Sequence, residues 1–266
     1  MRFKNLSQLK RPAPQQIPLA ILPQDIAMTY YARAKAFKVN ELVRTIHADS
    51  FEWYGFTLAA GDNPELIIDI GLPQNSQNQL DYATIGPAMI AEFQEKLPQA
   101  TIINGWIHSH GALNYRHFSH TDEKNHLAVL DFIEARLRRP IAKKQVVIQD
   151  LVLLEEKRFT ENDLKKGSVA IITDKPITAA KIMETVYGSF CYSIVIGDEG
   201  WHEQKIHYKE RAVLSGHTMV SSKTAKIVFV DTGKTLTQAA ISELSDEVQK
   251  KIKPHTDPPP ELIERM

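Results

Sequence analysis

The sequence predicts an α+β fold, with mixed α/β character, in which one mixed β-sheet is flanked by helices. Apolar runs typical of strands and periodic segments typical of helices are interspersed along the chain, and no internal repeat is present. The 266 residues are 43% hydrophobic and 24% charged, which is the composition of an ordinary globular protein. A chain of this length can bury a sizeable core. We therefore expect one main domain built around a single sheet.

The first half of the chain alternates between strand and helix patterns after a polar arm at residues 1–15. Apolar residues recur at near-helical spacing in the helical segments, and runs bounded by Gly, Pro or Asn mark the strands. A turn at 61–64 joins two strands, and 74–83 is polar and irregular. The predicted strands cover 17–22, 51–59, 65–72 and 101–108, and the predicted helices cover 24–47 and 86–97.

The second half begins with an amphipathic helix over 119–137, which Pro140 ends. A charged connector at 159–167 and a hairpin turn at 197–200 separate later strands. The predicted strands cover 146–154, 169–173, 192–196, 201–208 and 225–230, and a polar amphipathic helix covers 236–252. Beyond that helix, Asp257-Pro258-Pro259-Pro260 introduces a tail for which we expect no fixed structure.

Charge and cysteine content exclude several classes of function. The 32 basic and 32 acidic residues cancel, so neither a nucleic-acid platform nor binding to an anionic membrane is predicted. The single cysteine, Cys191, excludes an internal disulfide framework and a cysteine-based zinc knuckle, and we expect it to be buried packing. The first residues lack an apolar signal core, and no stretch approaches 18 apolar residues. We expect a cytoplasmic protein.

The segment that ends in His108-Ser109-His110 carries the most specific chemical signal. Two histidines two residues apart project from the same face of a strand, because side chains alternate with a period of two. Asp122, at the start of a predicted helix, can return to meet them. Two imidazoles and one carboxylate leave a fourth tetrahedral position for water. This arrangement is typical of a catalytic zinc site rather than a closed structural one.

Two further residues complete a candidate hydrolase site. Glu52 is the only acid in an apolar and aromatic stretch, where we expect a raised pKa. It is therefore the best candidate for a general acid/base that takes a proton from water and hands it to the leaving group. Ser119, three residues before Asp122, could donate a hydrogen bond to the oxyanion of a tetrahedral intermediate.

Each of these residues also has an ordinary structural interpretation. Ser119 and Asp122 have the spacing of a helix capping box, which is compatible with metal binding because a capped helix would hold Asp122 rigidly. His117, His120 and His126 lie nearby in the sequence. His126 follows Asp122 by four residues on the same helical face, so that pair could bind metal in principle. We interpret these three histidines as peripheral residues that face solvent or support the ligands.

Taken in order, the motifs resemble the JAMM signature of the MPN (JAB-type) metalloprotease family. The residues that carry the likeness are Glu52-x-x-Gly55, Gly105-Trp106-Ile107-His108-x-His110 and Ser119-x-x-Asp122, and matching elements run from about residue 20 to about residue 210. Two features depart from the family. Gly111 stands where the family usually has Pro, and eight rather than seven residues separate His110 from Ser119. One extra residue in a surface loop costs little free energy, so we expect the ligands still to converge.

The resemblance implies an MPN-type core, similar to that of cytidine deaminases, over residues 16–235. Within it, 140–185 corresponds to an insertion, a kind of region that in the family often contacts substrate or partners. After this domain, we expect 236–266 to form a C-terminal helix and a Pro-containing tail. The resemblance also implies a site built around one catalytic Zn²⁺ ion. Its implied ligands are His108, His110 and Asp122, with Glu52 as general acid/base and Ser119 as oxyanion stabiliser.

The activity implied by the resemblance is that of a peptidase or isopeptidase acting on a ubiquitin-like protein or its conjugates. A linear precursor of such a modifier is the close alternative substrate, and an activating or partner subunit stays open. Two other classes of function are also compatible with the sequence. One is a non-catalytic MPN-type scaffold in a protein assembly, and the other is a zinc amidohydrolase that cuts small amides.

Overall fold

The computed structural model describes residues 15–78, 85–113, 115–146, 151–166, 169–175 and 181–254. Contacts divide the chain into two compact units. The larger unit comprises Leu22–Arg139, Gly188–Glu210 and Met219–Met266. The smaller unit comprises Met1–Ile21, Pro140–Tyr187 and Arg211–Thr218. All the candidate site residues belong to the larger unit.

The larger unit contains a mixed sheet with helices on both of its faces. The strands of this unit are β2 (Ile26–Thr29), β3 (Trp53–Ala60), β4 (Leu66–Ile67), β5 (Asp69–Gly71), β6 (Asn75–Asn78), β7 (Thr101–Ser109), most of β11 (Ile182–Ile196), most of β12 (His202–Ala212), most of β13 (Thr218–Thr224), β14 (Ile227–Val230) and β15 (Ile252–Pro254). Of these, β14, β2 and β4 form a separate small sheet, and β15 pairs with β6. The helices of this unit are α1 (Tyr30–His47), α2 (Pro87–Glu95), α3 (His120–Leu137) and α5 (Gln238–Lys251).

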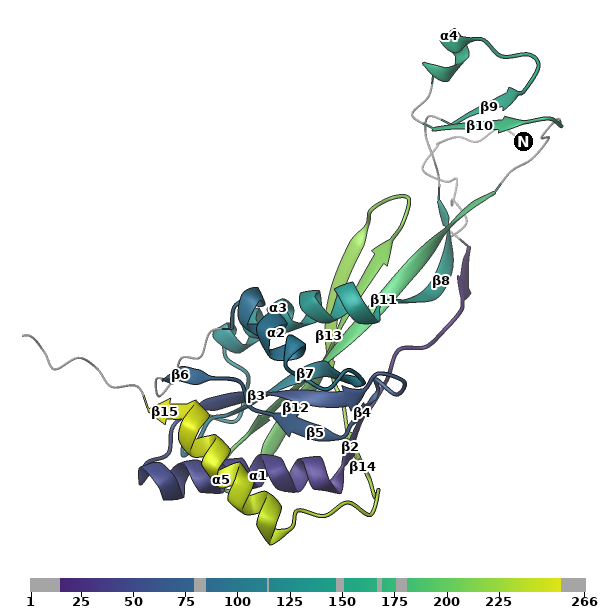
Figure 1. Cartoon of the computed structure of the whole chain (residues 1–266). Helices are drawn as coiled ribbons and strands as arrows, with labels where there is room; N and C mark the ends of the chain where they lie inside the picture. The colour runs from purple at the N-terminus through teal and green to yellow at the C-terminus, as the bar shows by residue number, and fades with distance from the viewer. Residues whose placement is uncertain are drawn as a thin grey trace, which may run out of the picture. The chain divides into compact units, whose positions relative to one another are not determined.

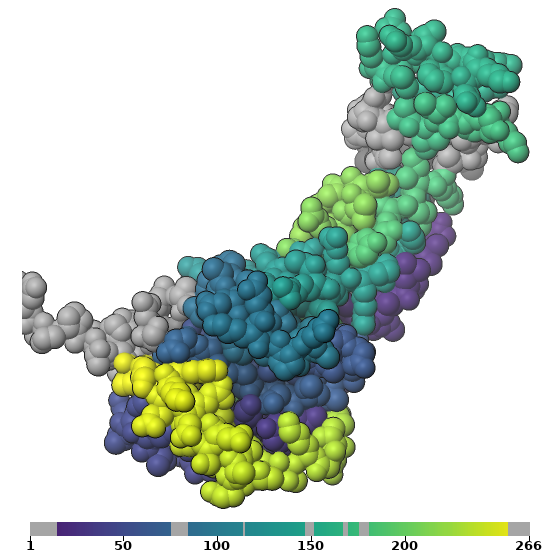
Figure 2. Space-filling model, in the orientation of Figure 1, coloured from purple at the N-terminus to yellow at the C-terminus, as the bar shows by residue number. Residues whose placement is uncertain are grey.

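The central strands of the larger unit run in the order β11-β7-β3-β5, and β12 pairs with β11. β7 is parallel to β11 and antiparallel to β3, so the predicted mixed sheet is confirmed. Helices α2 and α3 lie on one face of these strands, and α1 and α5 lie on the other (Figure 1). α5 is at the surface, where its exposed side chains form the yellow area in Figure 2. None of the helices in the described residues combines the length and the apolar character that a membrane crossing requires.

The main core lies between the sheet and the α2–α3 face. Its buried members come from β3, β7, β11, α2 and α3, and several are fully enclosed aromatic or branched side chains. The cluster comprises Tyr54, Phe56, Leu58, Ile85, Ile90, Ile103, Trp106, Val129, Leu130, Ile133 and Cys191. Each large apolar side chain buried in this way contributes about 1.5–3 kcal/mol to folding. This packing holds α3 against the end of β7.

A β-bulge in β7 sets which side chains face that core. Thr57 of β3 pairs with Gly105, but the next residue, Leu58, pairs with Ile103, so Asn104 has no cross-strand partner in the register. The extra residue shifts the alternation, which allows both Ile103 and Trp106 to join the same cluster. Downstream of the bulge the side chains alternate regularly, so His108 and His110 lie on the same face of the strand as Trp106.

The smaller unit is described separately. In it, β1 (Gln16–Pro18) pairs antiparallel with β8 (Arg139–Val146), and β9 (Leu151–Glu155) pairs parallel with β10 (Val169–Thr173). A short helix, α4 (Glu161–Leu164), follows β9. The carboxylate of Glu184 accepts hydrogen bonds from the backbone N–H groups of Leu214 and Ser215.

Some predicted elements differ from the structure where pairing across the chain overrides the local pattern. The predicted helix over 24–47 begins only at Tyr30, because Ile26–Thr29 forms strand β2 between β14 and β4. The Thr29 hydroxyl then caps α1 by accepting the N–H of Ala32 at 3.1 Å. The segment 74–83, predicted to be irregular, contains β6, which pairs with β15.

Other differences concern element ends. The connector over 159–167 contains α4. Of the strand predicted over 146–154, Val146 ends β8 and residues 151–154 belong to β9. Strands β8 and β13 were not predicted. The expected arm at residues 1–14 and the tail at 257–260 lie outside the described residues.

The backbone at Gly105 gives a test of the sheet geometry. A Cβ placed on Gly105 would lie 2.3 Å from the carbonyl oxygen of Tyr192 and 2.6 Å from Oγ1 of Thr57. Gly105→Ala should therefore lower the free energy of unfolding by about 1–3 kcal/mol, since the strands must separate to admit the methyl group. Gly86→Ala is the matched control, because a Cβ at Gly86 meets nothing within 4 Å. Equal urea midpoints for the two variants would contradict this packing.

Candidate metal centre

The two histidines of the motif lie at the end of β7 with their rings on the face of the sheet that α3 covers. Their Nε2 atoms are 3.1 Å apart, and the residues are 2% and 3% exposed for His108 and His110. The ring of His108 stacks on that of Trp106 at a centroid distance of 4.3 Å. The Nδ1 atom of His110 lies 2.7 Å from the carbonyl oxygen of Tyr115, which fixes the second ring. Both Nε2 atoms are thus directed to the same point.

Asp122 reaches that point from the first turn of α3. Its Oδ1 lies 3.2 Å from Nε2 of His108, and its Oδ2 lies 3.6 Å from Nε2 of His110. A capping box holds the carboxylate in place. The N–H of Ser119 donates to Oδ2 of Asp122 at 2.6 Å, and the N–H of Asp122 donates to Oγ of Ser119 at 3.2 Å. The capping and ligand interpretations of Asp122 therefore hold together in one geometry.

These three side chains could hold a metal ion. One ligand atom from each lies within 4.8 Å of the others. Atoms bound at about 2.0–2.1 Å to a tetrahedral ion lie about 3.3 Å from one another. The observed separations of 3.1, 3.2 and 3.6 Å bracket that value, so only small shifts would be needed for binding. Three protein ligands would leave a fourth coordination position for water or substrate.

The electrostatics of the group favour a carboxylate anion beside the two imidazoles. Burial by itself raises the pKa of Asp122, but bonds from His108, His110 and the Ser119 N–H outweigh it and hold that pKa well below its usual range. Burial lowers the pKa of His108, although Asp122 opposes the shift. For His110, burial is outweighed by Asp122, by the Tyr115 carbonyl and by Glu52, so its pKa is raised. A cation at this position is therefore favoured by the surrounding charge.

Glu52 lies beside the ligand group, immediately before β3. Its Oε1 is 3.9 Å from Nε2 of His110, and its side chain is 12% exposed. The carboxylate is thus close enough to contact a water molecule held by the ligand group. The structure brings together all five residues that the sequence singled out: Glu52, His108, His110, Ser119 and Asp122.

A buried polar network behind the site was not predicted from the sequence. Ser109, between the two histidines, points to the opposite face of β7 and donates its hydroxyl to the Asn40 side-chain oxygen in α1. The same oxygen accepts the indole N–H of Trp53 at 2.9 Å. The Asn40 amide donates to Asp198 at 2.6 Å, and that carboxylate also accepts the Ser50 hydroxyl. An asparagine within an otherwise apolar helical stripe was the one available signal.

Gly111, which departs from the JAMM pattern, occupies a position that proline cannot adopt. Its φ is +54°, whereas the proline ring fixes φ near −65°. Its N–H donates to Oγ of Ser109 at 2.8 Å, and proline lacks that hydrogen. The Gly111 carbonyl accepts the N–H of Asp198 at 3.1 Å. The glycine therefore joins the end of β7 to the network behind it.

Exposed aromatic and apolar side chains surround the site. Tyr115 is 50% exposed and stacks near the ring of His110, at a centroid distance of 5.8 Å. Trp201 meets the same imidazole edge-on at 6.1 Å, and Arg116 lies over the Trp201 ring. Leu113 is 39% exposed. These side chains give the approach to the ligands an apolar surface.

The three neighbouring histidines stand apart from this ligand group. His117 is exposed and pairs with Glu203, its Nδ1 lying 2.8 Å from a carboxylate oxygen. His120 is exposed at the first position of α3. His126 is fully buried beside Glu123, and its ring centroid lies 6.4 Å from that of His108. Asp122 and His126 do not form the pair that their spacing allowed in principle.

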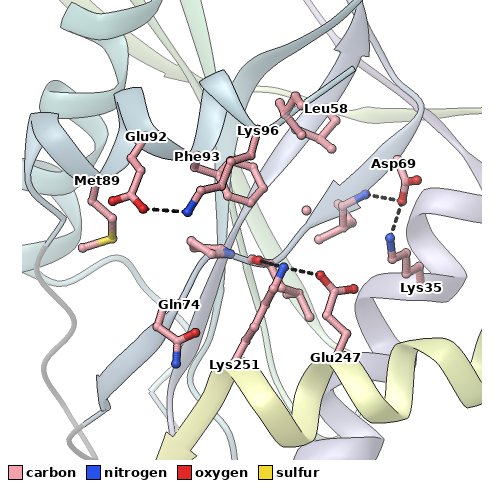
Figure 3. Close-up of a pocket in the computed structure, with 15 residues that line it drawn as sticks. Lys35, Leu58, Asp69, Gln74, Met89, Glu92, Phe93, Lys96, Glu247 and Lys251 are labelled. Atoms are coloured by element: carbon pink, nitrogen blue, oxygen red, sulfur yellow. Dashed lines mark hydrogen bonds and ion pairs between the residues drawn. The ribbon is translucent and has the colours of Figure 1, made fainter. Parts of the chain in front are cut away.

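A separate groove of about 310 Å³ lies along strand β5, between α2 and α5 (Figure 3). Its rim carries ion pairs between Lys96 and Glu92 and between Lys251 and Glu247, each at 2.6 Å. Lys251 also donates to the carbonyl of Leu72 at 2.7 Å. The described residues that line this groove do not include the candidate ligands, so the groove is not part of the metal centre.

Comparisons with known proteins do not assign a function, so the functional conclusion depends on the geometry of the site. The chain matches no protein-family model and no curated protein. What the molecule contains is a buried His-His-Asp group that could bind a metal ion, with a carboxylate within contact distance of it.

Proposed function

We propose that this chain is a zinc-dependent metallopeptidase of the JAMM type, built on an MPN-like core. The observation that carries the proposal is the convergence of three buried ligand atoms beside the Glu52 carboxylate. Two imidazoles and one carboxylate form the donor set of catalytic zinc sites that keep an open position. The ordered motif in the sequence supports the same assignment.

His108, His110 and Asp122 would hold the Zn²⁺ ion. When bound, the ion lowers the pKa of a water molecule and polarises the carbonyl of the bond to be cut. Glu52 accepts the proton of the attacking water and later donates it to the leaving amine. Ser119 uses a lone pair of Oγ to accept the Asp122 N–H, which leaves the hydroxyl hydrogen for donation to the developing oxyanion.

The proposed substrate is a protein that carries a ubiquitin-like modifier on lysine, cut after the carboxyl-terminal residue of the modifier. The modifier class rests on the motif resemblance. The exposed Leu113 and Tyr115 and the partly buried Trp201 support a peptide rather than a small polar amide, because they offer apolar contact area beside the ligands. A non-catalytic scaffold would be expected to lack at least one of the three ligand residues, and this chain has all three candidates.

Glu52→Gln should retain the metal and lose turnover by about 10²–10⁴-fold, since an amide cannot move the proton. Steady-state kinetics together with metal analysis of the same sample measure both effects. Glu92→Gln is the matched control, because Glu92 is an exposed α2 carboxylate paired with Lys96. Wild-type turnover in Glu52→Gln would eliminate Glu52 as the acid/base.

His108→Ala and Asp122→Ala should each lose the ion of this centre together with activity, because two remaining ligands bind weakly. Mass-spectrometric metal analysis after dialysis should show one equivalent per chain fewer than in the wild type. His117→Ala is the control, since His117 pairs with Glu203 outside the ligand group. Unchanged metal content in both ligand variants would show that these residues do not hold the ion and would contradict the proposal.

A panel of substrates tests the proposed specificity. Lysine peptides joined to a ubiquitin-like modifier by an isopeptide bond should be cut, and small aryl amides should be cut at least about tenfold less efficiently. Linear fusions of the modifier form the third arm and report on precursor processing. Hydrolysis of the small amides alone would replace the peptidase assignment with an amidohydrolase.

A further inference from the structure

A second cluster of metal-ligating side chains lies between α3 and β12. It consists of Glu123 and His126 on α3 and His207 on β12, and one ligand atom from each lies within 4.8 Å of the others. Oε2 of Glu123 is 3.9 Å from Nδ1 of His126 and 3.8 Å from Nε2 of His207. The two imidazoles face each other at a centroid distance of 4.7 Å. None of the three residues belongs to the proposed catalytic centre.

The imidazoles of this cluster lack the hydrogen bonds that buried polar groups usually make. His126 is 0% exposed and His207 is 2% exposed. Among the described residues, no hydrogen-bond partner is found for either ring nitrogen of His126 or for the Nε2 atom of His207. Buried side-chain nitrogens without partners are uncommon, because desolvation of the polar group is then uncompensated. Such an unpartnered pair, directed at a carboxylate, points to a ligand that the side chains share.

The separations also suit a bound ion rather than a direct ion pair. At 3.8 and 3.9 Å the nitrogen–oxygen distances are too long for hydrogen bonds. They exceed the separation of about 3.3 Å between the ligand atoms of a tetrahedral ion by only about 0.5 Å. A cation placed between the three groups would contact all of them after small rotamer adjustments.

Lys205 does not occupy the position of the ion. Its Nζ binds the other carboxylate oxygen of Glu123, Oε1, at 2.8 Å and lies over the ring of Phe118. Oε2 is left facing the two histidines. The ammonium therefore orients the carboxylate in the way that outer partners of metal ligands do.

Aromatic rings separate this cluster from the catalytic centre. His126 packs edge-on against Trp106 and Phe118, at centroid distances of 5.2 and 4.8 Å. Its ring is 6.4 Å from that of His108, and the two imidazoles are not hydrogen-bonded to each other. Asp122 and Glu123 are consecutive residues of α3, yet their carboxylates serve different groups.

We infer that Glu123, His126 and His207 form a second metal site, which takes a divalent transition ion of the zinc class and ties the start of α3 to β12. Two imidazoles and one carboxylate match the ligand preferences of Zn²⁺ and Co²⁺ and do not suit Ca²⁺ or Mg²⁺, which prefer oxygen ligands. An ion bound there would join α3 to β12 at a buried position.

Metal stoichiometry of the full chain tests this inference separately from the proposed function. The variants are His207→Phe for the second site, His110→Phe for the catalytic centre, and the two combined. His202→Phe is the matched control, because it places the same substitution on an exposed residue of the same strand. Each protein is dialysed against micromolar Zn²⁺ and analysed by mass spectrometry, and Co²⁺ loading is followed by its visible absorption. Glu123→Gln serves as a second removal of the site should His207→Phe fail to fold.

The inference predicts two equivalents of zinc in the wild type and in His202→Phe, one in each single-site variant and none in the combined variant. It also predicts that Zn²⁺ raises the thermal midpoint of His110→Phe, where only the second site is intact, and not that of the combined variant. One equivalent in the wild type, lost in His110→Phe and kept in His207→Phe and Glu123→Gln, would overturn the second site alone. One equivalent lost in His207→Phe and kept in His110→Phe would support it while overturning the catalytic centre.

Discussion

The end of β7 is held from both faces of the sheet, and the arrangement of the ligand group depends on that constraint. On the α1 face, Ser109 is tied to Asn40 and to the Gly111 N–H. On the α3 face, His108 stacks on Trp106, and the carbonyl oxygen of Tyr115 fixes the His110 ring. Because alternate residues are anchored in opposite directions, the end of the strand cannot rotate about its axis without breaking contacts on one face or the other. The protein thus supplies a preorganised pair of nitrogens rather than two flexible side chains.

The same region concentrates polar atoms inside an aromatic setting. Trp106 and Phe118 pack around His108 and His126, so the imidazoles exchange water for ring contacts rather than for hydrogen bonds. Burial of this kind keeps histidine neutral and leaves the nitrogen lone pairs available. A carboxylate on α3 faces each pair of rings, and helix N-termini favour negative charge at such positions. Both groups therefore have the charge pattern of a cation site, and both take their carboxylate from the first turn of one helix.

Local sequence patterns predicted the parts of the site that depend on local geometry. The period of two placed His108 and His110 on one face of a strand, and the Ser119 spacing indicated the cap that holds Asp122. The contributions of Asn40 and His207 could not be predicted, because each reaches the region from an element far along the chain. Asn40 comes from α1, and the pairing of β11 with both β7 and β12 brings His207 there. The strand at Ile26–Thr29 was read as helix for the same reason, since its partners β14 and β4 are remote. The zinc assignment and the peptidase activity stay predictions.

The capping box at Ser119 frees the segment before α3 from any role in placing Asp122. The helix start is defined by two bonds within four residues, and the packing of α3 on the sheet fixes its axis. The stretch from Gly111 to Phe118 holds the His110 ring through the Tyr115 carbonyl, but it does not have to place Asp122. A change in the length of this bridge would therefore reshape what docks above the ligands and act on His110, while the Asp122 carboxylate stays where it is.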